Sequence, residues 1–201
     1  NVHFVYCLID RDNVADIRRG HEDAENAYLA AVNEHIFFGG TLLSEDRKEA
    51  KGSLYVIDWP DRAAAKTWLA KSPYRNAGVY RDSRIRAYTH MVPKDGLAQS
   101  VDHELWAYVQ IDVPHSLELR RVHIDAHIDF LNNTADNIYS DGPLYWDSCK
   151  VEFEDRIGSL FVVDFPTLAT AEIWRLSEPF TVEGVYGTLY PYAYENHWPN
   201  S

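Results

Sequence analysis

The chain has 201 residues, of which 46% are hydrophobic and 25% are charged, and its formal net charge is -12. This length suits one large domain or two small ones, with enough apolar residues for packed cores. The acidic balance disfavours binding to nucleic acid. No apolar run approaches the roughly 18 residues that span a bilayer, so we expect no membrane association. No signal peptide is recognised at the start. Cys7 and Cys149 are too few for a disulfide framework, which indicates a reducing, cytoplasmic setting.

The first half of the chain predicts six elements in the order β-α-β-β-α-β. Runs of β-forming residues, helical periodicity and a helix start signal after Pro60 define their limits. The expected strands are 4–9, 36–43, 54–58 and 84–90, and the expected helices are 14–34 and 63–70. The first helix has an apolar face that we expect to turn toward the sheet, and this face comprises Ile17, His21, Ala24, Tyr28 and Val32.

The second half of the chain repeats the first. At an offset of 102 residues, 2–43 fall on 104–145 without a gap, and Tyr6 meets Tyr108. A four-residue insertion then raises the offset to 106 for the rest of the repeat. Matched pairs in this later part are Trp68 with Trp174 and Tyr80 with Tyr186. Matches that keep their order over nearly the whole unit indicate an internal duplication.

The repeat predicts two domains, 1–90 and 104–197, joined by a linker at 91–103 that contains Pro, Gly, Gln and Ser. The element order predicts an α+β fold of two tandem ferredoxin-like βαββαβ domains. One such sheet has a single helical layer and leaves its other face bare. We therefore expect the two copies to pack as an internal pseudo-dimer of the dimeric α/β-barrel type, and a further homodimer remains open.

A histidine recurs on the predicted apolar helix face of both copies, as His21 and His123, and an aspartate closes the first strand of each, as Asp10 and Asp112. The end of a strand lies close to the start of the helix that follows, so Asp10 could approach His21. A carboxylate beside an imidazole fixes its tautomer for acid–base chemistry near neutral pH. The alternatives are a packed core histidine and an aspartate that serves the turn.

Arg18 and Arg120 lie one helical turn before the histidines and could bind a carboxylate or phenolate of a substrate. Tyr80 and Tyr186 follow a Gly-Val pair and could donate to an oxygen in a pocket. The alternatives are solvated arginines and tyrosines that pack beneath a loop.

His123 and His127 are four residues apart on one helix, a spacing that can hold a metal, and the first copy offers His21 and Glu25 instead. Two ligands do not make a site, and no third is evident, so we predict no metal. There is no glycine-rich phosphate loop, nucleophile elbow or CxxC motif, and we expect no cofactor.

Several short motifs resemble the YCII-related family. They are Arg18-Arg19-Gly20-His21 with Ser72-Pro73-Tyr74 and Gly78-Val79-Tyr80 in the first copy, and Arg120-Arg121-Val122-His123 with Glu178-Pro179-Phe180 and Gly184-Val185-Tyr186 in the second. The resemblance implies a fold similar to muconolactone isomerases and a His/Asp centre, and one branch of the family removes chloride from a chlorinated hydroxyhydroquinone. If the family's acid is the D of its D-P-Y motif, its positions here hold Ser72 and Glu178, which raises the chance that only one copy is active.

These observations predict a cofactor-independent lyase or isomerase that acts on a small, oxygenated, aromatic-derived metabolite. The histidine would move a proton, the aspartate would orient it, and arginine, tyrosine or Glu178 would bind the substrate. The alternatives are a non-catalytic small-ligand-binding or assembly protein and a cofactor-free oxygenase on the same fold.

Overall fold

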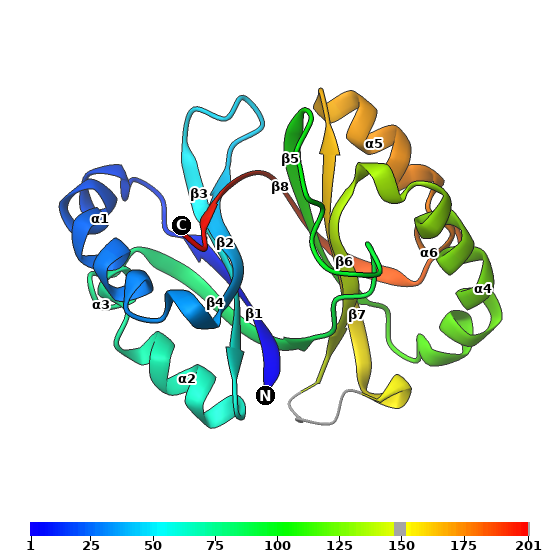
Figure 1. Ribbon diagram of the computed structural model, residues 1–201, viewed down its shortest axis with the longest axis horizontal. Coiled ribbons are helices and arrows are strands. Elements are labelled where there is room, and N and C mark those ends of the chain that lie inside the picture. The colour runs from blue at the N-terminus through cyan, green and yellow to red at the C-terminus, as the bar shows by residue number, and fades with distance from the viewer. Residues whose placement is uncertain (147–151, 201) are drawn as a thin grey trace. The chain divides into compact units, whose positions relative to one another are not determined.

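The computed structural model describes residues 1–146 and 152–200, which fall into two compact units. The first unit comprises 1–88 and 194–200, and the second comprises 89–146 and 152–193 (Figure 1). Cys149 and part of the connection that carries the four-residue insertion lie outside the described residues.

The first unit is a four-stranded antiparallel sheet with helices packed on one face. The strands lie in the order β4-β1-β3-β2. Their bounds are β1 (Val2–Asp10), β2 (Ile36–Leu43), β3 (Ala50–Trp59) and β4 (Tyr80–Tyr88), and the helices are α1 (Ala15–Ala30), α2 (Arg62–Ala70) and α3 (Pro73–Asn76), with a 3-10 turn η1 (Asn33–His35) before β2. This strand order is that of the ferredoxin-like fold.

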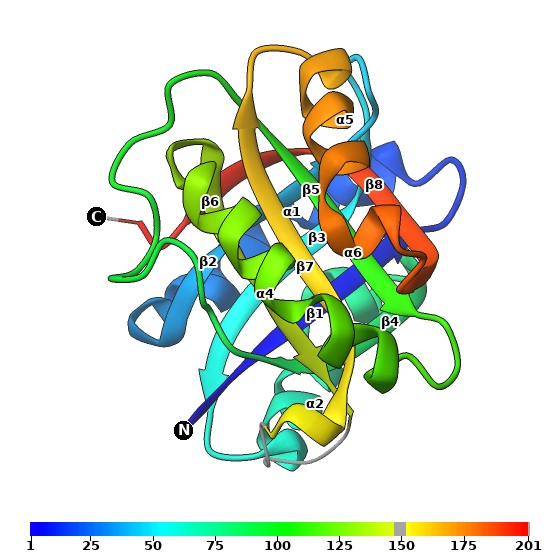
Figure 2. The same cartoon turned by 90° about the vertical axis from the view of Figure 1, so that its right-hand side faces the viewer.

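The second unit repeats this arrangement with the strand order β6-β7-β5-β8. The strands are β5 (Glu104–Asp112), β6 (Ile138–Tyr145), β7 (Arg156–Phe165) and β8 (Tyr186–Trp198), and the helices are α4 (Leu117–Asn133), α5 (Leu168–Ser177) and α6 (Pro179–Val182), with 3-10 turns η2 (Ala135–Asn137) and η3 (Phe153–Asp155). Figure 2 shows the three helices in front of this unit's strands. The predicted fold class, α+β with two tandem ferredoxin-like units, is confirmed.

Local sequence explains where the helices begin. Asp61 precedes α2, and its side chain accepts a hydrogen bond from the Ala64 N–H at 2.8 Å. Thr167 precedes α5 and forms a reciprocal capping box with Thr170. The first helix is shorter than the predicted 14–34, because α1 ends at Ala30 and the chain continues through the η1 turn.

The chain passes into the unit of the other repeat directly after β4 and again within β8, at residue 194. The expected linker 91–103 lies in the second unit, where the Met91 N–H donates to the Asp141 carbonyl at 2.7 Å and the Asp141 N–H donates to the Val92 carbonyl at 2.8 Å. At the other end of the chain, 194–200 lie in the first unit, where Asn200 and Asn33 exchange two hydrogen bonds of 2.9 Å. We call 89–94 and 194–200 the crossing segments.

Within 1–146 and 152–200, no helix is both long enough and apolar enough to cross a membrane.

Candidate active site

Each unit contains a buried arginine–aspartate pair between its first strand and first helix. In the first unit the Arg18 guanidinium donates to both carboxylate oxygens of Asp10, at 2.7 and 3.0 Å. Arg18 also donates to the Ser53 hydroxyl at 3.0 Å, and that hydroxyl lies 2.8 Å from the Tyr80 hydroxyl. The four side chains form one polar chain through the interior, and burial raises the pKa of Tyr80.

The second unit has the same polar chain at the matching positions. Arg120 donates to both oxygens of Asp112 at 2.6 and 2.9 Å and to the Ser159 hydroxyl at 3.3 Å. The Tyr186 hydroxyl donates to Ser159 at 2.8 Å, and burial raises its pKa too. The repeat of this chain in both units indicates a structural role, because each arginine's charge is already neutralised by its aspartate.

The expected approach of Asp10 to His21 does not occur, and the predicted orientation of the first helix is wrong. The buried face of α1 comprises Arg18, Glu25 and Leu29, whereas Ile17 is 37% exposed. His21 is exposed on the outer surface, with its Nδ1 atom 2.9 Å from the Ile17 carbonyl. The helix is rotated relative to the prediction because it buries two charged side chains together with Leu29 in place of the expected face.

His123 is also on the outer side of its helix. Its side chain is 26% exposed, and its Nε2 atom lies 3.6 Å from a carboxylate oxygen of Glu183. Neither His123 nor His21 is brought together with the aspartate that was expected to orient it.

A different histidine, His127, lies on the buried face of α4 and pairs with an acid. Its Nδ1 atom contacts the carboxylate of Glu178, and its ring stacks on Phe180 with the ring centroids 3.8 Å apart. Glu178 is fully buried and also accepts from the N–H groups of Phe180 and Thr181 at 2.9 and 3.0 Å and from the Thr181 hydroxyl at 3.1 Å. These contacts fix the carboxylate, which in turn fixes the imidazole and leaves Nε2 as its available nitrogen.

In the first unit a glutamate and a serine replace this histidine and glutamate. Glu25 stands at the position of His127, and Ser72 stands at that of Glu178. The Glu25 carboxyl group accepts from the Ser72 hydroxyl at 2.7 Å, the Tyr55 hydroxyl at 3.0 Å and the Tyr74 N–H at 3.1 Å. Burial raises the pKa of Glu25. The first unit therefore keeps a polar cluster here but has no imidazole in it.

His127 lines a cavity of about 540 Å³ in the second unit. This volume lies within the usual range for pockets that bind small molecules. Eight of the lining side chains are apolar, and they are Met91, Val92, Ile124, Ile128, Leu131, Pro143, Phe153 and Phe180. Seven are polar or charged, and they are Lys94, Arg120, His127, Asn132, Asp141, Arg156 and Ser159.

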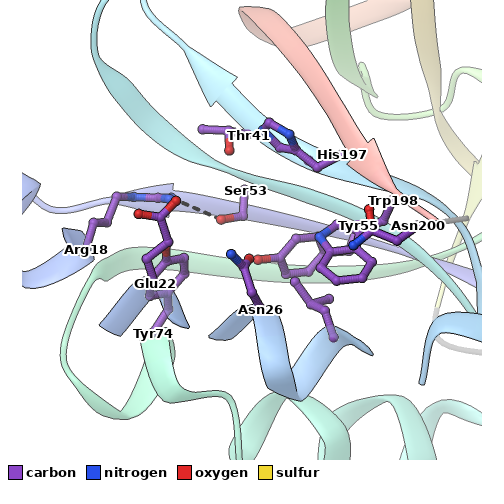
Figure 3. Close-up of a pocket in the computed structure, with 12 residues that line it drawn as sticks. Arg18, Glu22, Asn26, Thr41, Ser53, Tyr55, Tyr74, His197, Trp198 and Asn200 are labelled. Atoms are coloured by element: carbon purple, nitrogen blue, oxygen red, sulfur yellow. Dashed lines mark hydrogen bonds between the residues drawn. The ribbon is translucent and has the colours of Figure 1, made fainter. Parts of the chain in front are cut away.

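A smaller cavity of about 260 Å³ occupies the corresponding place in the first unit (Figure 3). Figure 3 shows Arg18 directed toward Ser53. Several of its wall residues are polar at positions where the second unit has apolar ones. These pairs are Glu22 and Ile124, Asn26 and Ile128, Thr41 and Pro143, Tyr74 and Phe180, and His197 and Met91. Asn200 matches Lys94. Both cavities thus have the same place in the fold but different chemistry, and a crossing segment lines each of them.

The metal-ligand spacing noted in the sequence does not form a metal site. His123 faces Glu183, whereas His127 faces Glu178. No group of three or more His, Cys, Asp or Glu side chains that could hold a metal ion occurs in the described part of the chain.

His127 was considered in the sequence only as a metal ligand, so the pair it forms with Glu178 was missed. The available signal was the spacing of the buried face: Arg120, His127 and Leu131 are seven and four residues apart, as are Arg18, Glu25 and Leu29. Anchoring the helix on the matched Leu29 and Leu131 would have placed His127 inside.

The comparisons with known proteins agree with this fold. Residues 2–89 match the YCII-related domain family. No curated protein sequence matches the chain. Among solved structures, a variant of chlorite dismutase from Candidatus Nitrospira defluvii is similar with 9% identity, 96% of this chain and 91% of that chain covered, and a TM-score of 0.64.

Two further solved structures are similar. An anthrone oxidase-like protein has 12% identity, with 98% of this chain and 91% of that chain covered and a TM-score of 0.58. The 5-chloro-2-hydroxyhydroquinone dehydrochlorinase of Burkholderia phenoliruptrix, solved with 2,5-dihydroxybenzoquinone, has 21% identity, with 45% of this chain and 93% of that chain covered and a TM-score of 0.44. The likenesses to chlorite dismutase and to the anthrone oxidase-like protein show a shared fold and do not identify a reaction.

Proposed function

We propose that this protein, whose residues 2–89 form a YCII-related domain, is a cofactor-independent lyase or isomerase that moves a proton on a small, oxygenated, ring-bearing molecule. The reaction takes place in the cavity of the second unit. The observation that carries this proposal is the pair formed by His127 and the fully buried Glu178 at the wall of that cavity.

The pair supports proton transfer through the free nitrogen of the imidazole. Because Nδ1 is engaged by Glu178, Nε2 accepts a proton from a carbon or hydroxyl of the substrate, and Glu178 stabilises the imidazolium that forms. In an isomerisation the imidazolium returns the proton to another atom of the substrate. In an elimination the electron pair left behind expels a leaving group.

The cavity walls support the choice of a ring-bearing substrate. Ile124 and Ile128 of α4 and Phe180 of α6 present apolar surface around His127. Apolar walls exclude water, which strengthens the electrostatic contacts within the site. A flat ring suits this surface, and the polar groups of the wall serve to orient its oxygens.

This proposal reassigns the acid–base role within the chain. It places that role on His127, and His21 and His123 remain surface residues. It also assigns Asp10 and Asp112 to holding Arg18 and Arg120, and not to orienting an imidazole. The first unit, with Glu25 in place of the histidine, has no catalytic role of this kind.

The test is turnover of a panel of hydroxylated aromatics, quinols and unsaturated lactones by the wild type and by His127→Gln. We expect kcat/KM to fall by about 100-fold or more, the usual contribution of general acid–base catalysis. His123→Gln is the matched control, since it removes an imidazole one turn away on the same helix, and its kcat/KM should stay within about twofold of the wild type.

Two results would count against the proposal. Loss of turnover in His123→Gln with His127→Gln unaffected would place the chemistry on the outer face of α4. Tight binding of a panel member without any turnover would support a non-catalytic ligand-binding protein instead.

A further inference from the structure

The carboxyl group of Asp141 is buried at the cavity wall without a full set of partners. Asp141 is 2% exposed and lines the cavity together with His127. Its backbone is bonded to the crossing segment, but its Oδ1 atom has no hydrogen-bond partner among the described residues. A buried polar atom without a partner is costly, and where it faces a cavity a ligand is the natural partner.

The surroundings of Asp141 favour the protonated form of its carboxyl group. Burial raises its pKa well above the usual range, and the charge of Glu178 acts in the same direction, whereas Arg120 and Arg156 lower it. In that form the carboxyl group of this cavity-lining residue can donate a hydrogen bond.

Arg156 supplies a second unused donor at the same wall. Its Nε–H group is buried and is unpartnered in the part of the chain that the structure describes, while its guanidinium lies over the ring of Phe153 with Cζ 4.7 Å from the centroid. Arg120 at this wall is already paired with Asp112. Arg156 is therefore the arginine of the cavity whose donor remains available.

Both side chains are specific to the second unit. The matching positions in the first unit hold Gly39 and Ala50. These two side chains therefore distinguish the cavity of the second unit from that of the first.

We propose that Asp141 and Arg156 form a subsite that binds an anionic oxygen of the substrate, so that the molecule acted on is a ring compound with a carboxylate or phenolate group. Two hydrogen-bond donors among the side chains that line one cavity can bind an oxygen that carries negative charge. Lys94, which lines the same cavity, adds a positive charge. This inference rests on the proposed function, since it names the substrate class of the same site.

Binding of small probes, measured by isothermal titration calorimetry, tests the subsite without any turnover. The probes are benzoate, phenol, benzamide and benzylamine, which share a ring and differ in their polar group. We expect benzoate to bind at least tenfold more tightly than neutral benzamide, and benzylamine to bind most weakly. A preference for phenol at a pH where it ionises, with none for benzoate, would show that the anionic oxygen is a phenolate.

The decisive variants are Asp141→Gly and Arg156→Ala, which introduce the residues of the first unit. Each should reduce the preference for the anionic probe by about tenfold and leave benzamide affinity within about threefold. Arg121→Ala is the matched control, because Arg121 also lies over Phe153, with Cζ 5.3 Å from the centroid, but does not line the cavity.

Equal affinity for benzoate and benzamide together with no preference for ionised phenol, an unchanged preference in both variants, or no binding of any probe would overturn the subsite. The result is separable from that of the proposed function. An anion preference that depends on Asp141, in a protein whose turnover is indifferent to His127→Gln, would keep the subsite and reject the acid–base role of His127.

Discussion

Two substitutions account for much of the chemical difference between the repeats. The positions of Glu25 and Ser72 in the first unit are occupied by His127 and Glu178 in the second. The carboxyl group of the pair therefore belongs to α1 in the first unit, whereas in the second unit it belongs to the residue that precedes α6. Either pair satisfies its hydrogen bonds in the same place. Only the second contains an imidazole, whose ordinary pKa near neutrality suits proton transfer in both directions, and the proposed chemistry is therefore placed in that unit.

Asp141 leads to a prediction about stability and pH. In the folded chain, burial raises the pKa of this carboxyl group above its ordinary value of 3.8. The charge of Glu178 also raises this pKa, whereas Arg120 and Arg156 lower it. His127 is a further titratable group that lines the same cavity. A group with a raised folded-state pKa favours folding below its unfolded value, and this contribution is lost as the pH rises toward the folded value. Asp141→Asn cannot ionise and should therefore gain stability relative to the wild type as the pH rises above about 4.

Urea denaturation of both proteins at several pH values between 4 and 8 measures this difference. Asp12→Asn, which changes an exposed aspartate, is the control and should show no such trend. A stability difference for Asp141→Asn that stays constant or reverses with rising pH would mean that the carboxyl group is ionised without cost in the folded state.

At this scale the sequence revealed the right residue types more readily than their contacts. Arg18, Arg120, Tyr80 and Tyr186 were recognised as recurrent, yet the structure ties them into internal polar chains with Ser53 and Ser159. Periodicity assigns apolar residues to the inner face, so a helix that buries charged residues is misread by it. Which of these side chains contact one another depends on side-chain geometry, and the spacing of residues in the sequence does not reveal it.

The glycine inside α1 provides a test of the stability of this helix. Gly20 lies inside this helix, and a Cβ added there would meet nothing within 4 Å. Gly20→Ala should therefore raise the free energy of unfolding by about 0.5–1 kcal/mol, the usual difference between the two residues in a helix.

Gly40 in β2 provides the opposite expectation. A Cβ there would lie 1.9 Å from the backbone oxygen of Glu195 in the crossing segment. Gly40→Ala should lower the free energy of unfolding by about 1–3 kcal/mol, as overpacking does. Thermal denaturation of the two variants checks both signs, and a stabilising Gly40→Ala would show that 194–200 do not lie against β2 as described.

The element order of both units follows from the sequence, because period-two and helical patterns differ clearly and the repeat supplies two readings of each. The strand 36–43 agrees with β2 in both limits. The short helices α3 and α6 were not expected, since four residues are too few to show a helical period. They matter for the site, because Ser72 and Glu178 immediately precede them.

On the scale of the whole chain, the crossing segments are the feature that the sequence did not reveal. A stretch with Pro, Gly and Ser reads as a linker, yet 91–94 supply cavity walls to the second unit, and 197–200 do so for the first. Contacts between segments far apart in the chain leave no pattern in the local sequence. The domains expected from the sequence, 1–90 and 104–197, therefore have different bounds from the two compact units.

Trp198 tests the role of its crossing segment. It is buried and lines the cavity of the first unit. Trp198→Ala should destabilise that unit by about 3–5 kcal/mol, as for other large-to-small changes of buried aromatics. Hydrogen exchange should then speed up in α1 and β2 more than in α4 and β7.

The reciprocal variant is Val92→Ala, because Val92 matches Trp198 in the repeat and lines the cavity of the second unit. Its smaller effect should appear in α4 and β6. Faster exchange in α4, with α1 unchanged, in Trp198→Ala would show that 194–200 stabilise the other unit.

We expect small ring-bearing molecules to bind in contact with the imidazole of His127. The most direct measurement is a titration with benzoate and with phenol, followed by NMR of the nitrogen-labelled histidine rings, with the His127 signals identified by their absence in His127→Gln. We predict that the Nε2 signal of His127 shifts with ligand concentration and that those of His21 and His123 stay in place. A shift of His21 or His123 with His127 unmoved would contradict the account.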